Sequence, residues 1–537
     1  MNGSTLSLRH MVLWTVLAFG FTLLPYIWVA AATPEGQVFT ATLVNPDDTS
    51  VYLSAIRQGK EGNWLFHYQY SSEAITPKFM YILYLALGKL SAWLGGGQLL
   101  WFHLGRLASG LMTLIAGWIW VRAVLPERPR WQATAWFIIV FAGGFGWLLA
   151  ILADTPFKQI PELGLGEWGL MMPLLGTPHF ALGLGLTILF MSGVVLAVRT
   201  GKVRWWVGTA VIGLLLGLTY SFQIPVLYAV IGVYLLVLAW QQRAVPWRLV
   251  LTAGLALAPT LPLLFYYGFW ATRDELWAFL QVQHNVIPSP SPLALLLSWG
   301  LIAPLAVAGG WCWLRDQRDP FVLVWAIVQV GMLYVPVPYA GRFLLAVVVP
   351  VGTLAAYGLE EVVLPWLWHH GRDNFWQRLS ANPYASLRRL ILIFTLPSTL
   401  LVVLFLTQVA TVRPDYPLFI PEADAQAVSW LANQTTADDL VLAAYPVGNY
   451  LPGRAAARVF AGQYFLTLNM EEKLADVATF WQTETTADWR ERFLAEWGIT
   501  LVYAGTYEQM LGATAVTPPG RLVYDQDGVK IYDVRQP

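Results

Sequence analysis

The chain has 537 residues, 57% of them hydrophobic and only 12% charged, and its formal net charge is +0. Several apolar runs reach the roughly 20 residues that a helix needs to cross a bilayer, so the composition predicts an α-helical polytopic membrane protein in a lipid bilayer. The balanced charge gives no indication of nucleic acid as a partner. The single cysteine, Cys312, excludes an intramolecular disulfide, so any extracytoplasmic part must hold together by packing.

The first apolar segment, 11–31, follows Arg9 and His10. This arrangement predicts a helix whose N-terminus lies in the cytoplasm. The segment continues into a polar loop without a small-residue cleavage motif, so we expect a membrane anchor, with an uncleaved signal as the alternative. A first outer loop is then predicted over about 32–98.

The segment 75–94 is apolar but contains a proline, a glycine and two lysines. If it crossed the membrane, the loop with Arg122, Arg128 and Arg130 would lie outside, and every later basic loop would be inverted as well. If it lies along the outer surface as an amphipathic helix, all these loops fall in the cytoplasm, as the positive-inside rule requires. We therefore predict an interfacial helix here.

This choice gives about eleven membrane-spanning helices. They are predicted over 11–31, 99–121, 131–152, 180–198, 205–222, 224–240, 247–270, 293–314, 321–337, 343–366 and 390–410. The odd number places the C-terminus outside. No span carries a mid-helix Asp, Glu or Lys, which favours chemistry at the outer boundary over passage through the bilayer. We predict a protein of the plasma (inner) membrane with a cytoplasmic N-terminus.

The composition turns polar from Arg413 onward and stays so. Helices are predicted over 422–433, 471–481 and 488–497, strands over 440–444 and 499–504, and a hairpin over 522–534. A tail of about 125 residues can bury a core of its own. The sequence thus predicts a transmembrane domain over 1–410 and a small extracytoplasmic α/β domain over 411–537.

Two adjacent carboxylates, Asp47 and Asp48, follow the first span. Locally they are explained by a helix start, with Pro46 and an Asp or Thr cap opening a helix that stops near Gly59. The functional alternative is a carboxylate at the water–membrane boundary that removes a proton from an acceptor hydroxyl, while the pair can share a divalent cation, Mg²⁺ or Mn²⁺. The two explanations are compatible. We prefer Asp48 as the base, because Asp47 directly after proline is the better cap or supporting partner.

Further outer-face side chains are candidates for binding a charged substrate. Arg342 precedes a long apolar helix and either pairs with a nearby carboxylate or grips a lipid-borne phosphate with its forked guanidinium. Arg106, near the outer end of its span, is either a ligand contact or part of a helix-packing salt bridge. Glu73 and Lys78 are either solvated loop residues or substrate contacts.

Two aromatic or imidazole side chains complete the predicted substrate-binding set, Tyr339 beside Arg342 and His179 after Pro178 at a helix start. His179 fits an interfacial or capping position better than a metal ligand. The outer-loop histidines lack close metal-ligand spacing, so the sequence does not support a zinc site.

Four features carry a resemblance to a known family. They are the acidic pair after the first span, the interfacial segment 74–94, Gly105-Arg106-Leu107-Ala108-Ser109, and Gly341-Arg342-Phe343-Leu344 before a late apolar helix. Together they resemble the GT-C superfamily of polytopic glycosyltransferases, in particular bacterial proteins similar to protein mannosyltransferases and aminoarabinose transferases. No Trp-Trp-Asp-type motif of oligosaccharyltransferases is present, which counts against transfer of a whole oligosaccharide to protein.

The tail is similar to one found on other members of this superfamily, through Leu451-Pro452-Gly453-Arg454, Ala461-Gly462-Gln463, Lys473 and the segment 502–508. Three positions depart from the pattern. Ala108 replaces a proline, Thr76-Pro77-Lys78 replaces a His-Pro-Pro-type entry, and Gln463 stands where relatives often have histidine. The last departure weakens the expectation of a catalytic role for the tail.

The resemblance implies transfer of a sugar from a polyprenyl-phosphate-linked donor to a saccharide, lipid or protein acceptor on the outer face. Asp47 or Asp48 would be the base of an inverting displacement, and Arg342 would hold the donor phosphate, with Arg106 or Lys78 assisting. Such a donor requires no nucleotide, and the chain shows no phosphate-cradling Gly-rich loop. The alternatives are a lipid flippase or transporter, and an inactive membrane scaffold whose tail binds the cell wall.

Overall fold

The computed structural model describes residues 8–152, 159–370, 382–412 and 414–535, and its chain divides into two compact units. Unit 1 consists of Met1–Pro25, Arg106–Trp270 and Val286–Leu406, and unit 2 consists of Tyr26–Gly105, Ala271–Asn285 and Thr407–Pro537. The predicted outer loop therefore groups with the tail rather than with the spans. The predicted domain boundary at 410/411 lies close to Thr407, where the last segment of unit 2 begins.

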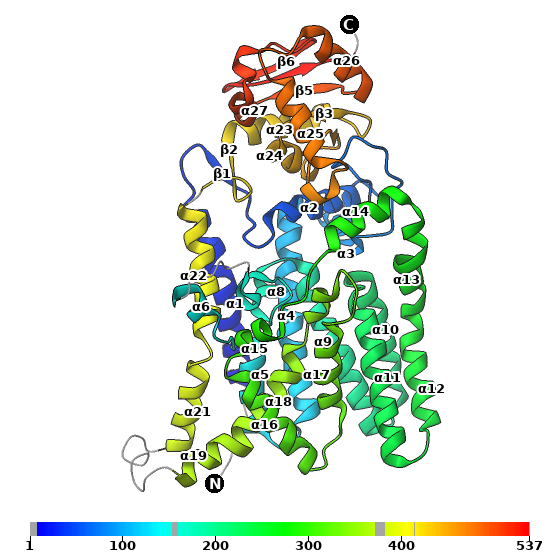
Figure 1. Cartoon of the computed structure of the whole chain (residues 1–537), viewed down its shortest axis with the longest axis vertical. Coiled ribbons are helices and arrows are strands. Elements are labelled where there is room, and N and C mark those ends of the chain that lie inside the picture. The colour runs from blue at the N-terminus through cyan, green and yellow to red at the C-terminus, as the bar shows by residue number, and fades with distance from the viewer. Residues whose placement is uncertain (1–7, 153–158, 371–381, 413, 536–537) are drawn as a thin grey trace. The chain divides into compact units, whose positions relative to one another are not determined.

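Unit 1 is helical, because long apolar segments in this part of the chain satisfy their backbone groups internally (Figure 1). Proline occupies the first turn of α5, α9, α15 and α21, where its missing N–H costs nothing. The helices that lie wholly or largely in unit 1 are α1 (Leu8–Ala31), α4 (Gln98–Val124), α5 (Pro129–Phe141), α6 (Gly146–Leu152), α7 (Pro161–Gly164), α8 (Met171–Leu175), α9 (Pro178–Thr200), α10 (Val203–Thr219), α11 (Gln223–Gln242), α12 (Trp247–Leu257), α13 (Leu261–Phe265), α15 (Pro292–Trp299), α16 (Ile302–Arg315), α17 (Phe321–Met332), α18 (Val348–Gly358), α19 (Leu364–His370), α21 (Pro383–Ile393) and α22 (Pro397–Val412).

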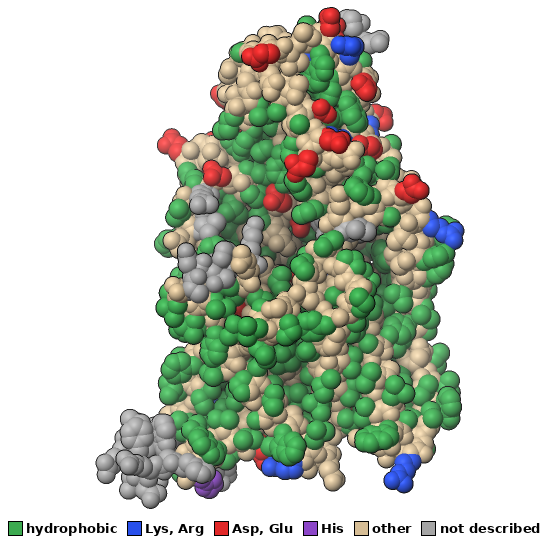
Figure 2. Space-filling view, viewed as in Figure 1, with side chains coloured by type: hydrophobic (Ala, Val, Ile, Leu, Met, Phe, Trp, Pro, Cys, Tyr) green, Lys and Arg blue, Asp and Glu red, His purple; other side chains and the backbone are tan. Residues whose placement is uncertain are grey.

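Within the described residues, eight helices are long and apolar enough to cross a membrane, or nine if the bent pair α15 and α16 forms one span. The eight cover Val12–Ala31, Gln98–Val124, Pro129–Leu152, Pro178–Thr200, Gln223–Gln242, Trp247–Arg273, Val348–His369 and Tyr384–Gln408. The chain is thus a multi-pass membrane protein. Hydrophobic side chains cover much of the visible face of these helices (Figure 2).

The three other predicted spans are helical but shorter or broken. Two of them are the apolar helices α10 and α17, and the third is the α15–α16 pair, which bends by 89°. The total of eleven crossings therefore stays a prediction. One expectation is wrong: no span was expected to carry a mid-helix acidic residue, but Glu360 lies near the middle of the span Val348–His369, where it pairs with Arg388 at 2.6 Å.

The predicted interfacial segment forms a short helix, α3 (Ile82–Leu94), whose 13 residues are too few to span a bilayer. It packs against α2 (Pro46–Lys60) through two glycines, Gly59 and Gly88. A Cβ atom on Gly88 would lie 2.1 Å from the Ile56 carbonyl oxygen, so the close helix crossing depends on glycine here. Trp93 at the end of α3 is 81% exposed. Its position at a membrane surface stays a prediction.

The tail forms a five-stranded sheet in the order β4-β3-β5-β7-β6 (Figure 1). Strands β4, β3 and β5 are parallel, and β5, β7 and β6 are antiparallel. Asp527 and Gly528 both have positive φ and close the predicted hairpin between β6 and β7. The strands are β3 (Leu440–Leu442), β4 (Arg458–Val459), β5 (Leu501–Ala504), β6 (Arg521–Gln526) and β7 (Val529–Asp533).

Alternating side chains of this sheet enter two apolar clusters, one on each face. Val441 and Tyr503 pack with α23 (Glu422–Gln434), whereas Leu442 and Val502 pack with α25 (Met470–Phe480) and α26 (Ala487–Trp497). Two short helices, α24 (Tyr445–Tyr450) and α27 (Thr506–Leu511), follow β3 and β5. The outer loop adds β1 (Gln37–Phe39), which pairs antiparallel with β2 (Phe419–Pro421).

Candidate active site

The acidic pair lies in the first turn of α2, in unit 2. Asn45 precedes this helix in the left-handed region, with φ 51° and ψ 52°, and Pro46 starts it. The predicted helix start is therefore correct, but the capping position belongs to Asn45 rather than to Asp47. Both aspartates are partly exposed, and their negative charge is favoured at a helix N-terminus. The side chain of Asn45 makes no capping hydrogen bond.

The side chain of Asp47 is held by α24 of the tail. Its Oδ1 accepts hydrogen bonds from the Tyr445 hydroxyl at 3.0 Å and from Asn449 Nδ2 at 3.4 Å. Asn449 Nδ2 also lies 3.2 Å from the Asp47 carbonyl oxygen. Burial and the charge of Asp47 raise the pKa of Tyr445, so the phenol stays a proton donor in this bond.

Asp48 is held by the residue that departs from the family pattern. Gln463 Nε2 donates to Asp48 Oδ1 at 2.9 Å, while Gln463 Oε1 accepts from the backbone N–H of Phe465 at 2.8 Å. The Gln463 side chain is buried, so the backbone bond fixes which end of the amide faces Asp48. An amide cannot titrate, so this donor stays available to Asp48 at any pH. The tail contacts the predicted base directly, contrary to what the loss of histidine suggested.

Both sets of partners follow the carboxyl ends of parallel strands, since α24 follows β3 and Gln463 follows β4. This edge is where open α/β sheets commonly bind ligands. The Glu508 side chain reinforces it by accepting from the backbone N–H groups of Ala444 and Gly505, at the ends of β3 and β5. Within unit 2, the acidic pair thus occupies the ligand-binding edge of the tail sheet.

The other predicted residues of unit 2 form ion pairs. Glu73 bonds Lys473 Nζ through both carboxylate oxygens, at 2.8 and 2.7 Å, and Lys473 is buried. Burial alone would raise the pKa of Glu73, but the hydrogen bonds from Lys473 and Ser71 lower it. Lys78 Nζ lies 2.7 Å from Asp274 Oδ2. Glu73 and Lys78 therefore tie the outer loop to other parts of unit 2.

Arg342 belongs to unit 1, in the 3₁₀ turn η5 (Ala340–Leu344). Its Nη1 donates to Glu167 Oε1 at 2.9 Å, and the Tyr220 hydroxyl donates to the same oxygen at 3.2 Å. Its guanidinium also lies 5.0 Å from the centre of the Phe222 ring. The carboxylate pairing that the sequence left open is therefore present, with Glu167 as the partner.

An aromatic cluster surrounds this pair. The Tyr339 ring lies 5.6 Å from Phe222, and the His179 ring lies 6.1 Å from Tyr220, measured between ring centres. His179 is the second residue of α9, as its place after proline predicted. Unit 1 thus brings Arg342, Tyr339 and His179 into one cluster. Arg106, also in unit 1, is buried in α4 and donates from Nη1 to the Leu174 carbonyl at 3.4 Å.

No protein-family model and no curated protein matches the chain, but solved structures do. An oligosaccharyltransferase of Archaeoglobus fulgidus matches with 12% identity and a TM-score of 0.53, over 92% of this chain and 69% of its own. ArnT from Cupriavidus metallidurans, bound to undecaprenyl phosphate, matches with 15% identity and a TM-score of 0.50, over 97% of both chains. The mycobacterial arabinofuranosyltransferase AftD matches with 15% identity and a TM-score of 0.53, over 99% of this chain and 42% of its own.

The chain has the fold of the GT-C glycosyltransferases. The resemblance stated from short motifs is confirmed at this level. The matches include an oligosaccharyltransferase, although the chain lacks the Trp-Trp-Asp-type motif of such enzymes. At these identities the likeness concerns the fold, and the reaction must be argued from the residues.

In this GT-C fold, the described residues contain no group of three or more His, Cys, Asp or Glu side chains arranged to hold a metal ion. Asp47 and Asp48 remain the predicted ligands. Two carboxylates suit Mg²⁺ or Mn²⁺ only if water and substrate phosphate complete the coordination. The predicted cation therefore stays a prediction.

Sequence reasoning missed several residues of both clusters. Gln463 was read as a departure, and Tyr445, Asn449, Glu167 and Tyr220 were given no role. Only Gln463 carried a signal, because it occupies a position where relatives have a side chain that can bond a carboxylate.

Proposed function

We propose that this protein is a membrane glycosyltransferase that moves a sugar from a polyprenyl-phosphate donor to an acceptor hydroxyl on the outer face of the membrane. The observation that carries the proposal is the acidic pair, which is partly exposed and oriented by neutral donors at the ligand-binding edge of the tail sheet. The GT-C fold supports it, since one similar structure is bound to undecaprenyl phosphate and another is in complex with a dolichol-phosphate.

Asp48 is the proposed general base. Its hydrogen bond comes from the neutral amide of Gln463 rather than from a cation, and a carboxylate can accept the proton of the acceptor hydroxyl. Asp47 shares the helix N-terminus and supports the same orientation through Tyr445 and Asn449. The acceptor oxygen attacks the anomeric carbon from the side opposite the phosphate, and the configuration inverts. The bond between the sugar and phosphate breaks, and polyprenyl phosphate leaves with the electron pair.

Arg342 is the proposed cation for the leaving phosphate. A forked guanidinium suits phosphate oxygens, and negative charge that develops on the leaving group needs such a donor. In the structure Glu167 accepts from Arg342, so the guanidinium has an anionic partner before a donor lipid binds. Donor phosphate would share or replace that bond. The nearby Tyr339 and His179 rings are proposed to contact the donor.

Reconstitution tests the proposal. The purified protein in proteoliposomes is supplied with radiolabelled polyprenyl-phosphate sugars and a panel of envelope lipids and polysaccharides, and labelled product is followed. We expect transfer with inversion at the anomeric carbon. Movement of the labelled lipid between leaflets without any sugar transfer would refute the proposal and support a flippase. If the protein shows neither sugar transfer nor lipid movement, the proposal is refuted and the scaffold interpretation is supported.

A further inference from the structure

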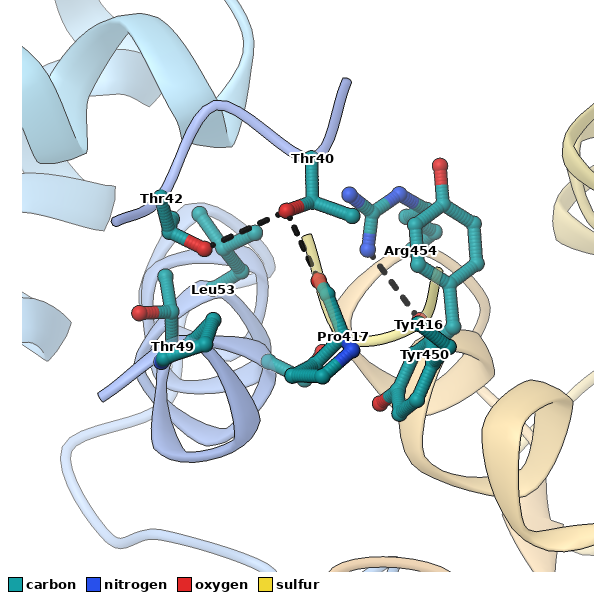
Figure 3. A pocket seen from close by; sticks show the side chains of 10 residues that line it. Thr40, Thr42, Thr49, Leu53, Tyr416, Pro417, Tyr450 and Arg454 are labelled. Atoms are coloured by element: carbon teal, nitrogen blue, oxygen red, sulfur yellow. Dashed lines mark hydrogen bonds between the residues drawn. The ribbon is translucent and has the colours of Figure 1, made fainter. Parts of the chain in front are cut away.

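A small cavity in unit 2 lies beside the acidic pair and is not used by the proposed reaction (Figure 3). Its walls come from the outer loop, from α2, from the segment that enters β2, and from the end of α24 with the following residues. It is lined by Thr40, Thr42, Pro46, Thr49, Ser50, Leu53, Tyr416, Pro417, Tyr450 and Arg454. The cavity has a volume of about 10 Å³, which admits a single oxygen-sized group and excludes a sugar ring.

Arg454 gives this cavity a positive charge. The half-buried guanidinium lies 3.3 Å from the centre of the Tyr450 ring, and Nη1 donates to the Tyr450 carbonyl at 3.2 Å. Among the described residues, no carboxylate lies within ion-pair distance of Arg454. An arginine has five N–H donors, and the Tyr450 carbonyl takes one of them, so the partly exposed guanidinium keeps donors for an anion. The cavity is therefore complementary to an anion.

The hydroxyl groups in the cavity wall are held by hydrogen bonds to neighbouring oxygen atoms. The Thr40 hydroxyl donates to the Pro417 carbonyl at 3.0 Å, so Thr42, 3.3 Å away, donates to Thr40. The Thr49 hydroxyl donates to the Asn45 carbonyl at 3.2 Å. The three threonine protons are thus already donated to oxygen atoms, so Arg454 is the donor for an anion, and the lining contains no carboxylate that would repel one. Thr40, Thr42 and Thr49 are buried, whereas Tyr416 and Arg454 are partly exposed, as are two lining prolines, Pro46 and Pro417.

The position of the cavity relates it to the acidic pair. Pro46, which lines it, directly precedes Asp47. The Tyr416 ring lies 5.9 Å from the Tyr445 ring, whose hydroxyl bonds Asp47. A group bound at Arg454 would thus be separated from the proposed base region by only two tyrosine rings of the same unit.

We propose that the Arg454 cavity receives one oxygen of a terminal oxyanion, a carboxylate or a phosphate monoester carried by the sugar acceptor, while the rest of that group stays outside the cavity beside the guanidinium. Because the cavity is small, only the end of a molecule fits it. Because the guanidinium has no carboxylate partner among the described residues, that end is expected to carry a negative charge. This identifies the acceptor as an anionic molecule. The acceptor role rests on the proposed function, whereas binding of an oxyanion at Arg454 does not.

Isothermal titration of the full-length protein tests the binding. The protein carries Arg342→Gln, so that the proposed donor site does not compete, and it is purified in detergent without anionic lipid. Inorganic phosphate and, separately, acetate are the probes. We expect saturable binding of phosphate or acetate that weakens at least tenfold when Arg454→Gln is added, since a charge-assisted hydrogen bond contributes roughly this much. Arg458→Gln, which removes a neighbouring arginine bonded to the Ser72 carbonyl, is the matched control and leaves binding unchanged.

Arg454→Lys covers the case in which Arg454→Gln does not fold, because it keeps the charge and loses the fork. It is expected to bind phosphate more weakly than the parent but to saturate. No saturable binding in the parent, or equal binding in parent, Arg454→Gln and Arg454→Lys, overturns the proposal and leaves Arg454 as a packing residue on Tyr450. Displacement of bound phosphate by a short-chain phosphatidic acid assigns the oxyanion to a lipid acceptor, and failure to displace it assigns a soluble one. Intact phosphate binding, together with no sugar transfer by the protein that retains Arg342, would refute the proposed function and leave the oxyanion site standing.

Discussion

Replacing Gln463 with glutamate is the most informative single change, because it puts a negative charge where a neutral donor now contacts Asp48. The two side chains lie 2.9 Å apart. Two charges at about 3 Å repel by roughly 1.4 kcal/mol in water and roughly 5.5 kcal/mol at an effective dielectric constant of 20. Because Asp48 is partly exposed, the lower part of this range applies. On the acid side of the activity profile, this energy corresponds to a displacement of about one to two pH units.

The assay is the pH dependence of sugar transfer. A carboxylate base must be ionised to work, so activity falls on the acid side as Asp48 takes up a proton. Gln463→Glu is expected to move this acid limb to higher pH by about one to two units, with most activity recovered above it. Gln482→Glu, at an exposed position of the tail, should leave the limb in place. An acid limb that does not move in Gln463→Glu, or that moves equally in both variants, would refute the role of Asp48 as base or of Gln463 as its partner.

Three further predictions concern contacts inside unit 1 or inside unit 2. Glu167→Gln leaves the nearly buried Arg342 without its carboxylate partner, which should lower the melting temperature of the protein. Polyprenyl phosphate should restore part of this loss, because it supplies an anion to Arg342. The melting temperature of Arg342→Ala should not respond to the lipid. Lys473→Met removes the partner that lowers the pKa of Glu73. A lowered pKa stabilises the fold above the ordinary value of 4.5, and this contribution is lost as pH falls below that value. The melting temperature of the variant should therefore lie below wild type at pH 7 and approach it as pH falls below 4.5, whereas Lys530→Met, at an exposed position, should show no such trend. Gly88→Ala forces α2 and α3 apart and should lower the free energy of unfolding by roughly 1–3 kcal/mol or more, which is measured as a lower melting temperature. Gly97 has open space around it, so Gly97→Ala should leave the melting temperature unchanged.

The parts of the fold that local patterns determine were predictable from the sequence. Each of the eleven apolar runs forms a helix or a bent helix pair, and the hairpin closes at Asp527 and Gly528. Hydrophobic length and turn chemistry are properties of neighbouring residues, so they can be read without knowing the tertiary structure. The number of crossings was less accessible, because α10 and α17 are shorter than the apolar runs that contain them.

The contacts that define the site could not be predicted in the same way. Gln463 bonds Asp48 across a separation of 415 residues, and Arg342 bonds Glu167 across 175. Nothing in the local sequence around Asp48 indicates a partner in the tail, because the pairing depends on the order of strands β4, β3 and β5. The residue types of the acidic pair and of Arg342 indicated chemistry, whereas their partners depended on topology.

The transfer rate of Asp48→Asn in proteoliposomes tests the central claim most directly. Asparagine keeps the shape of the side chain but cannot accept a proton, so loss of a general base should lower the rate by about 10²- to 10⁴-fold, with insertion and melting temperature close to wild type. Asp438→Asn removes an exposed carboxylate of the tail and should transfer sugar at the wild-type rate. Equal transfer by Asp48→Asn and Asp438→Asn would contradict the account.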